Sequence, residues 1–165
     1  MNLRLATPDD AAALRELMAE GFEGYRDFAP EGWEPALPPL EAMRDRLELT
    51  SHWCAVVTDE TGEVVAHVAF LDAADSGHPD NEPGLAHLWQ MFARPAYWGT
   101  GIAPQLMTFA VETARDLGYT AMRLFTPTGA MRPRRFYERE GWSLARPPAF
   151  DERIGLEIAE YRRAL

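Results

Sequence analysis

Hydrophobic and polar positions follow two different periods along the chain, and the periods separate predicted strands from predicted helices. An apolar run at 85–93 is hydrophobic on both faces, as in an interior strand, and Arg94-Pro95 ends it. Downstream, one set of side chains recurs at helical spacing: Ile102, Leu106, Phe109, Ala110, Thr113 and Leu117. Gly118 follows as a C-terminal cap would. The sequence therefore predicts a strand joined to a helix.

The same patterns predict the elements on either side. In chain order, the predicted strands cover 2–6, 53–58, 63–71, 85–93, 121–125, 141–145 and 154–162. Three further helices are predicted: one starts from Thr7 as its N-cap, one covers 40–49, and one lies between the strands at 121–125 and 141–145. The segments 25–39 and 72–84 are predicted to be loops. This order indicates the α+β class, with a mixed, mostly antiparallel sheet flanked by helices.

Length and composition favour one domain over residues 1–165. The chain has 165 residues and 47% hydrophobic residues, which is enough to bury a sizeable core. It has neither an apolar run of membrane-spanning length nor a secretory leader, so we expect no membrane partner and a cytoplasmic location. The single cysteine, Cys54, excludes an internal disulfide and is interpreted as a small buried side chain.

The charged residues exclude several classes of function. All 16 cationic side chains are arginines, so a Walker-type phosphate loop and Schiff-base chemistry, which both need lysine, are excluded. The net charge of −10 disfavours a nucleic-acid partner. Six arginines nevertheless gather in one stretch, which is either a solvated helix face or a source of phosphate contacts: Arg123, Arg132, Arg134, Arg135, Arg139 and Arg146.

Two closely spaced glycines, Gly99 and Gly101, stand between the predicted strand at 85–93 and the helix that follows. Such a turn lets the backbone approach an anion, and the helix start adds about half a positive charge. An ordinary tight turn has the same pattern. A nicotinamide-dinucleotide domain is disfavoured, because the third glycine of its fingerprint is absent.

Two motifs resemble those of one enzyme superfamily. The run ARPAYWGTGIAPQLM at 93–107 resembles the acyl-coenzyme A signature of the GNAT N-acetyltransferases. The run RRFYEREGW at 134–142 is similar to the closing motif of that family, a tyrosine followed four residues later by Gly and an aromatic residue. The resemblance implies an N-acetyltransferase that moves an acetyl group from acetyl-CoA to a primary amine by direct attack in a ternary complex.

The resemblance also implies the cofactor site. The strand at 85–93 would splay from its neighbour at 120–126, and the pantetheine arm would lie in the gap. The pyrophosphate would rest on backbone amides at the start of the helix. The implied cofactor-binding residues are Phe92, Ala93, Trp98, Gly99, Thr100, Gly101, Ile102 and Ala103.

The candidate catalytic residues are Tyr137 and His87. Tyr137 matches the family tyrosine near the thioester sulfur; a phenol with a pKa of about 10 is protonated at neutral pH and can protonate the departing thiolate. A buried aromatic packed with Phe136 and Trp142 is the alternative. His87 is the candidate base, and on strict alternation it shares a face with Trp89 and Met91.

Other readings of the histidines remain open. A satisfied core histidine is the alternative for His87, and His67 is a weaker candidate base. His52 and His78 are interpreted as surface or loop residues. No cluster has the spacing of a metal site, so no metal is expected.

Departures from the family pattern leave a second function open. Trp98 stands where the signature usually has Arg or Gln, Pro104 removes one N–H, and Ala130 replaces a common Asn. The alternative function is a catalytically inactive acyl-CoA-binding sensor or partner module. The segments 25–34 and 72–84 are expected to wall the acceptor site. The sequence does not choose the amine, and it leaves a homodimer open.

Overall fold

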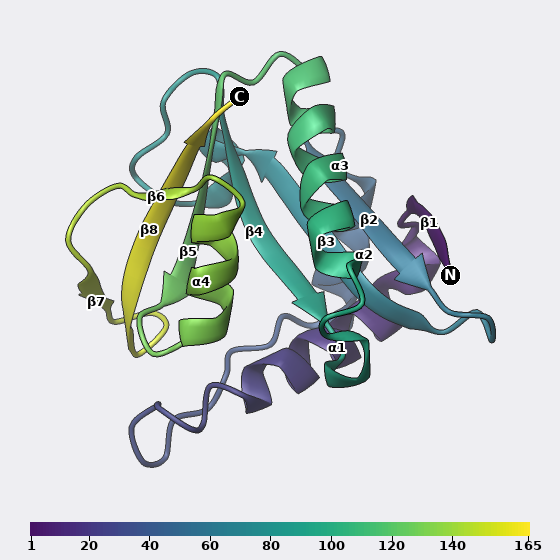
Figure 1. Cartoon of the computed structure of the whole chain (residues 1–165), viewed down its shortest axis with the longest axis horizontal. Coiled ribbons are helices and arrows are strands. Elements are labelled where there is room, and N and C mark those ends of the chain that lie inside the picture. Colours follow the sequence, from purple (N-terminus) through teal and green to yellow (C-terminus); the bar gives the residue numbers. More distant parts are fainter.

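The computed structural model describes all residues from 1 to 165, and its strands form one mixed sheet in the order β1-β2-β3-β4-β5-β8-β6, with β7 paired to β8 (Figure 1). The strands are β1 (Asn2–Leu5), β2 (His52–Thr58), β3 (Val64–Asp72), β4 (Leu85–Ala93), β5 (Ala121–Pro127), β6 (Ser143–Leu144), β7 (Ala149–Asp151) and β8 (Leu156–Ala164). The helices are α1 (Ala11–Glu23), α2 (Leu40–Glu48), α3 (Ile102–Asp116) and α4 (Met131–Arg139), with 3-10 turns η1 (Pro8–Asp10), η2 (Ala73–Ser76) and η3 (Pro95–Tyr97).

All neighbouring strands pair antiparallel except β4 and β5. These two are joined by α3, because a parallel pair needs a long crossover connection. The α+β class with a mostly antiparallel sheet is therefore confirmed. The parallel pair lies in the middle of the sheet and separates its N-terminal half from its C-terminal half.

Helices cover both faces of the sheet (Figure 1). On one face α3 and α4 pack over a core cluster of 20 buried residues, to which the strands contribute alternate side chains such as Val57. On the other face α1 and α2 pack over a cluster of nine buried residues that includes Val56. The side chains of successive strand residues thus pack into the cores on opposite faces of the sheet, as the strand period of two residues requires.

The predicted strands and helices agree with the structure to within a few residues, except near the C-terminus. The expected strand at 141–145 is reduced to the two residues of β6, and β7 forms after Pro147-Pro148, where no strand was expected. Both short strands are largely exposed, so they lack the apolar alternation that would reveal them. None of the helices combines the length and apolar character that crossing a bilayer requires.

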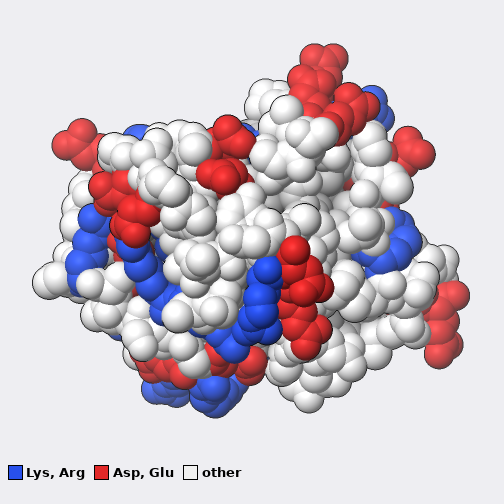
Figure 2. All heavy atoms as spheres, turned by 90° about the horizontal axis from the view of Figure 1, so that it is seen from above, with Lys and Arg blue, Asp and Glu red and all other residues white.

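Arginine and acidic side chains lie next to one another on the face shown in Figure 2. One arginine departs from the expected basic stretch. Arg123 lies in β5, not on a helix, and its side chain is fully buried. Its guanidinium donates to the Ser76 hydroxyl at 2.9 Å and to the backbone carbonyl of Asp80, which ties the loop after β3 to the sheet. A buried cation needs such partners to offset its lost hydration.

Candidate functional site

The candidate site begins where β4 and β5 separate. Their parallel pairing ends at Leu88 and Leu124, although β4 extends to Ala93 and β5 to Pro127. Beyond that point β4 stays paired with β3, and β5 stays paired with β8. The two strands diverge in Figure 1. Two strand edges with unpaired backbone groups therefore face each other across a gap near the middle of the sheet.

A β-bulge bends β4 at the same place. Ala69 of β3 pairs with Gln90, and the next residue, Phe70, pairs with Leu88, so Trp89 is an extra residue without a partner. A bulge of this kind twists and bends its strand, and it is common beside functional sites. The bulge gives a physical reason for the separation of β4 from β5.

The turn before α3 presents free backbone donors. Gly99 and Gly101 have positive φ angles of 79° and 89°, and a Cβ at either would meet open space. The amides of Gly99, Gly101, Ile102 and Ala103 form no hydrogen bond with another backbone group. They add to the positive end of a 15-residue helix, which makes this turn suited to an anion.

In the turn, two of the expected cofactor-binding residues have their amides already occupied. The N–H of Trp98 donates to the carbonyl of Pro95 at 3.1 Å, and that of Thr100 donates to the carbonyl of Tyr97 at 3.4 Å. The first bond closes the 3-10 turn η3, which local sequence did not predict, and the carbonyl of its last residue accepts the second. Fewer backbone N–H groups are therefore free to bind an anion than the motif implied.

The Trp98 side chain links β4 to α4. Its indole Nε1 donates to the carbonyl oxygen of Ala93 at 2.8 Å, and the Arg132 guanidinium carbon lies 3.9 Å from the centre of its ring. The Arg94 N–H donates to Val65 on β3, so the Ala93 carbonyl in the same peptide plane points toward the gap. The indole therefore occupies a strand-edge acceptor beside the glycine turn and brings a cation there.

Tyr137 lies in α4 with its side chain buried in the cluster beneath α3. Burial raises the pKa of its phenol well above the usual value, so the group is protonated at neutral pH. The hydroxyl of neighbouring Tyr161 is bonded to Arg134 and Glu138, whereas that of Tyr137 has no partner in the protein. No group of the protein accepts a hydrogen bond from this hydroxyl.

Tyr25 is a residue that the sequence named only as part of an acceptor wall. It follows α1, and burial raises its pKa to about 12. Its ring centre lies 5.5 Å from that of Phe28, and the Phe28 ring packs directly against Gly129, just before α4. The segment after α1 is thus in proximity to the start of α4. No local signal in the sequence indicates this proximity.

His87 lies at the closed end of the gap. Arg123 Nε donates to its Nδ1 at 3.4 Å, and its ring centre is 5.3 Å from that of Phe125. Burial, together with the charge of Arg123, lowers its pKa to about 3, which makes it a weak proton acceptor. The bulge also corrects the expected alternation: Trp89 packs against the cluster under α1, but Met91 packs against the one under α3.

The other histidines fall in two groups. His67 is fully buried and pairs with Gln90 at 3.2 Å. His52 begins β2 and accepts a hydrogen bond from Trp89 at 3.0 Å, so it is not the surface residue that was expected. Burial lowers the pKa of both to about 4. His78 lies in a loop, as expected, and no group of His, Cys, Asp or Glu is arranged to hold a metal ion.

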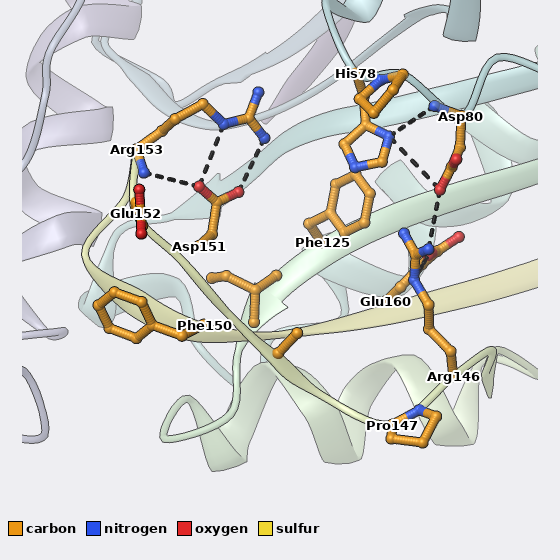
Figure 3. Close-up of a pocket in the computed structure, with 13 residues that line it drawn as sticks. His78, Asp80, Phe125, Arg146, Pro147, Phe150, Asp151, Glu152, Arg153 and Glu160 are labelled. Atoms are coloured by element: carbon orange, nitrogen blue, oxygen red, sulfur yellow. Dashed lines mark hydrogen bonds and ion pairs between the residues drawn. The ribbon is translucent and has the colours of Figure 1, made fainter.

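A cavity of about 590 Å³ opens beside β5 and β8 (Figure 3). The loop before β4 contributes His78 and Asp80, and β5 contributes Phe125. The remaining walls come from the segment 146–153 and from β8. Of the two expected acceptor walls, the loop 72–84 lines this cavity. The segment 25–34 does not line it; there, Trp33 Nε1 donates to the Ile154 carbonyl at 2.8 Å.

Comparison with known proteins shows the family. The sequence model of the acetyltransferase (GNAT) family matches residues 13–142. The uncharacterized N-acetyltransferase YjgM of Escherichia coli is 27% identical over 140 residues, which cover 85% of this chain and 80% of that protein. A ycf52-like uncharacterized N-acetyltransferase of Prochlorococcus marinus is 30% identical over 59 residues, but these span only 36% of this chain and 31% of that relative.

Solved structures share the fold. The structure of yncA from Salmonella typhimurium with its cofactor acetyl-CoA superposes with a TM-score of 0.78 and 19% identity, covering 99% of this chain and 93% of that one. The separated central strands, the glycine turn and the motif tyrosine thus coincide with a family match over most of the chain. This chain belongs to the acetyltransferase (GNAT) family.

Proposed function

We propose that this protein is an N-acetyltransferase that moves an acetyl group from acetyl-CoA to a primary amine by direct attack in a ternary complex. The observation that carries the proposal is the gap between β4 and β5, with four unpaired backbone amides at its edge. An elongated cosubstrate with a diphosphate and amide groups matches that arrangement: the anion suits the amides, and the amide groups suit the strand edge.

The residues proposed to hold acetyl-CoA fall into two sets. The amides of Gly99, Gly101, Ile102 and Ala103 would hold the diphosphate, because an added Cβ at either glycine would intrude on otherwise open space. The β4 edge from Phe92 to Ala93 would bind the arm as an added strand. Trp98 and Thr100 are proposed to contribute side chains, since their amides are engaged.

Tyr137 is proposed as the general acid. Bound acetyl-CoA supplies an activated thioester, and the amine nitrogen forms the amide bond as the carbon–sulfur bond breaks. The Tyr137 phenol gives its proton to the departing thiolate and regains one as the amine nitrogen loses its own. The raised pKa of Tyr137 keeps the phenol protonated until that step. The products are an N-acetyl amide, coenzyme A and one proton.

His87 stays the candidate proton acceptor, but its low pKa argues against an efficient role as a general base. A histidine whose pKa is about 3 removes protons inefficiently from an ammonium group near neutral pH. Loss of the amine proton to solvent before attack is the simpler route. Replacement of His87 by glutamine should then leave unchanged the rise of kcat/KM with increasing pH, because that rise follows deprotonation of the amine.

A second candidate is an inactive acyl-CoA-binding module. The bond between Trp98 Nε1 and the Ala93 carbonyl favours it, because this bond occupies an acceptor on the strand edge. Two measurements separate the candidates: calorimetric titration with acetyl-CoA, and thiol release over a panel of primary amines. Binding with amine-dependent thiol release supports the enzyme. Binding without release from any amine supports the module, and the absence of binding contradicts both.

A further inference from the structure

The cavity beside β5 and β8 lies on the sheet face opposite α3 and α4. Ile158 and Glu160 of β8 line it, whereas the alternate residues Ala159 and Tyr161 pack into the cluster beneath α3 and α4. The proposed cosubstrate site at the start of α3 and the cavity thus approach the gap from opposite faces. A second reactant held in the cavity would meet the first in the gap.

Phe125 connects the cavity to the gap. It is the first residue of β5 beyond Leu124, where the pairing with β4 ends, and its ring forms part of the cavity wall. The ring centres of His78 and His87 lie 4.9 Å and 5.3 Å from that of Phe125, and of these two histidines only His78 is part of the cavity wall. Figure 3 shows His78 packed over Phe125.

Every arginine in the cavity wall is already paired with a carboxylate (Figure 3). Arg146 bonds Asp80 at 2.9 Å and the buried Glu160 at 2.6 Å. Arg153 bonds Asp151 at 2.9 Å. No cation of the wall is left to bind a carboxylate on a ligand.

The wall also has carboxylates in excess. It contains four acidic residues against the two arginines. Arg162, outside the wall, also bonds Glu160 at 2.7 Å, but Glu152 is exposed and forms no ion pair. Burial lowers the pKa of His78, as do the charges of Arg123 and Arg146, so this histidine adds no cation at neutral pH. A cation is therefore favoured at the open side of the cavity, and an anion is not.

The rest of the wall is apolar and accessible. Phe150 is 63% exposed although it is a large aromatic residue, and Ala149, Ile158 and Phe125 continue the apolar surface toward the gap. The other part of the wall is polar or charged, so a cavity of this size suits a small organic molecule with both an apolar and a charged part.

We propose that this cavity binds the acceptor, and that the acceptor is a primary amine attached to an apolar, aromatic body and carrying no carboxylate. This inference rests on the proposed function, because the ligand of the cavity is an acceptor only if the protein transfers an acetyl group. The aromatic body would lie along Phe150 and Phe125, while the amine is drawn in as a cation by the acidic wall. The amine nitrogen would then be directed to the gap, where it attacks the thioester of acetyl-CoA and receives the acetyl group while Tyr137 protonates the departing thiolate.

Three amines that differ at one carbon test the class: 2-phenylethylamine, phenylalaninamide and phenylalanine. Binding is measured by calorimetry on the full chain without acetyl-CoA, and kcat/KM by thiol release with it. Phenylalanine should bind at least about tenfold more weakly than 2-phenylethylamine. Its carboxylate would be repelled by the unpaired carboxylate of Glu152, and no arginine of the wall is free to bind it. Phenylalaninamide, which has no carboxylate, should recover most of the affinity. Equal or tighter binding of phenylalanine overturns the proposal.

Two variants test the location. Phe150→Ala should raise the Kd for 2-phenylethylamine about tenfold, and Glu152→Gln about threefold, with the Kd for acetyl-CoA unchanged in both. Leu144→Ala and Glu157→Gln are the matched controls, since both residues are exposed and lie outside the wall. Unchanged amine affinity in Phe150→Ala, or no amine binding to the wild-type chain, overturns the cavity assignment.

The same titrations keep this inference apart from the proposed function. Suppose that acetyl-CoA binds and some amine causes thiol release, but Phe150→Ala has no effect. This result contradicts the cavity as the acceptor site and still supports the enzymatic function. The expected amine pattern without acetyl-CoA binding contradicts the enzyme and supports the cavity as an amine site. Because Phe150 and Glu152 are exposed, neither substitution should lower the Tm by more than a degree or two, which thermal unfolding checks.

Discussion

The indole of Trp98 donates its N–H to the carbonyl oxygen of Ala93 at 2.8 Å, on the edge of β4 that faces the gap. The two residues are five positions apart, and η3 folds the chain back so that they meet. A side chain of the protein thus holds an acceptor that the proposed cosubstrate would otherwise use. Three consequences of the site and one of the core can be measured.

Trp98→Phe should tighten the binding of coenzyme A. The change keeps an aromatic ring under Arg132 and removes the N–H that occupies the Ala93 carbonyl. A hydrogen bond is worth about 1 kcal/mol net, so the Kd should fall by about threefold to fivefold in calorimetry. Trp33→Phe, which removes an indole N–H bonded to Ile154 instead, should leave the Kd unchanged. A weaker complex in Trp98→Phe would contradict this prediction and show that the indole N–H, and not only the aromatic ring, binds the cosubstrate.

Gly101→Val should weaken acetyl-CoA binding by at least about tenfold. A side chain at this position would fill the open space before the α3 amides, and a φ of 89° would cost about 1–2 kcal/mol of stability. Gly118→Val is a matched control, because that residue has a φ of 91°, is also open to solvent and lies at the far end of α3. Equal affinities of the two variants would contradict the anion site.

Tyr137→Phe should lower kcat by about a hundredfold while acetyl-CoA affinity stays within about twofold. The hydroxyl has no partner in the protein, so its loss should not lower the free energy of unfolding. Tyr161→Phe is the control: its ring centre lies 6.2 Å away, but its hydroxyl is bonded to Arg134 and Glu138. That variant should lose stability and keep its turnover. Unaltered kcat in Tyr137→Phe would remove the general-acid role.

Stability should fall as the pH drops from about 7 toward 4. His52 and His67 are buried and neutral in the folded chain with pKa values of about 4, against about 6.5 unfolded. The unfolded chain therefore binds more protons across this window, so the free energy of unfolding decreases with falling pH. The fully buried His67 accounts for up to about 3 kcal/mol of that decrease.

Urea unfolding of wild type and His67→Gln at pH 7 and pH 5 measures this decrease. The variant should be less stable at pH 7, because the packing around Gln90 is disturbed, but its stability should fall less on acidification. If acidification lowers the free energy of unfolding of both proteins equally, the pH dependence comes from groups other than His67.

Residues close in sequence determined much of this fold. The strand at 85–93, the glycine turn and the α3 helix depend on local periodicity and on two positive φ angles that glycine adopts without strain. The family motifs lie in those same local segments, so the sequence alone indicated the family. It also placed Tyr137, because that residue belongs to a short motif within α4.

Tertiary structure decided what the local pattern could not contain. The bulge at Trp89 breaks the alternation that placed Met91 with His87, and it arises from pairing with β3. The packing of the Phe28 ring against Gly129 joins segments more than a hundred residues apart. The low pKa of His87 comes from burial, which depends on every element packed around it. Period and turn chemistry act over a few residues, whereas desolvation and long-range pairing exist only once the chain has folded.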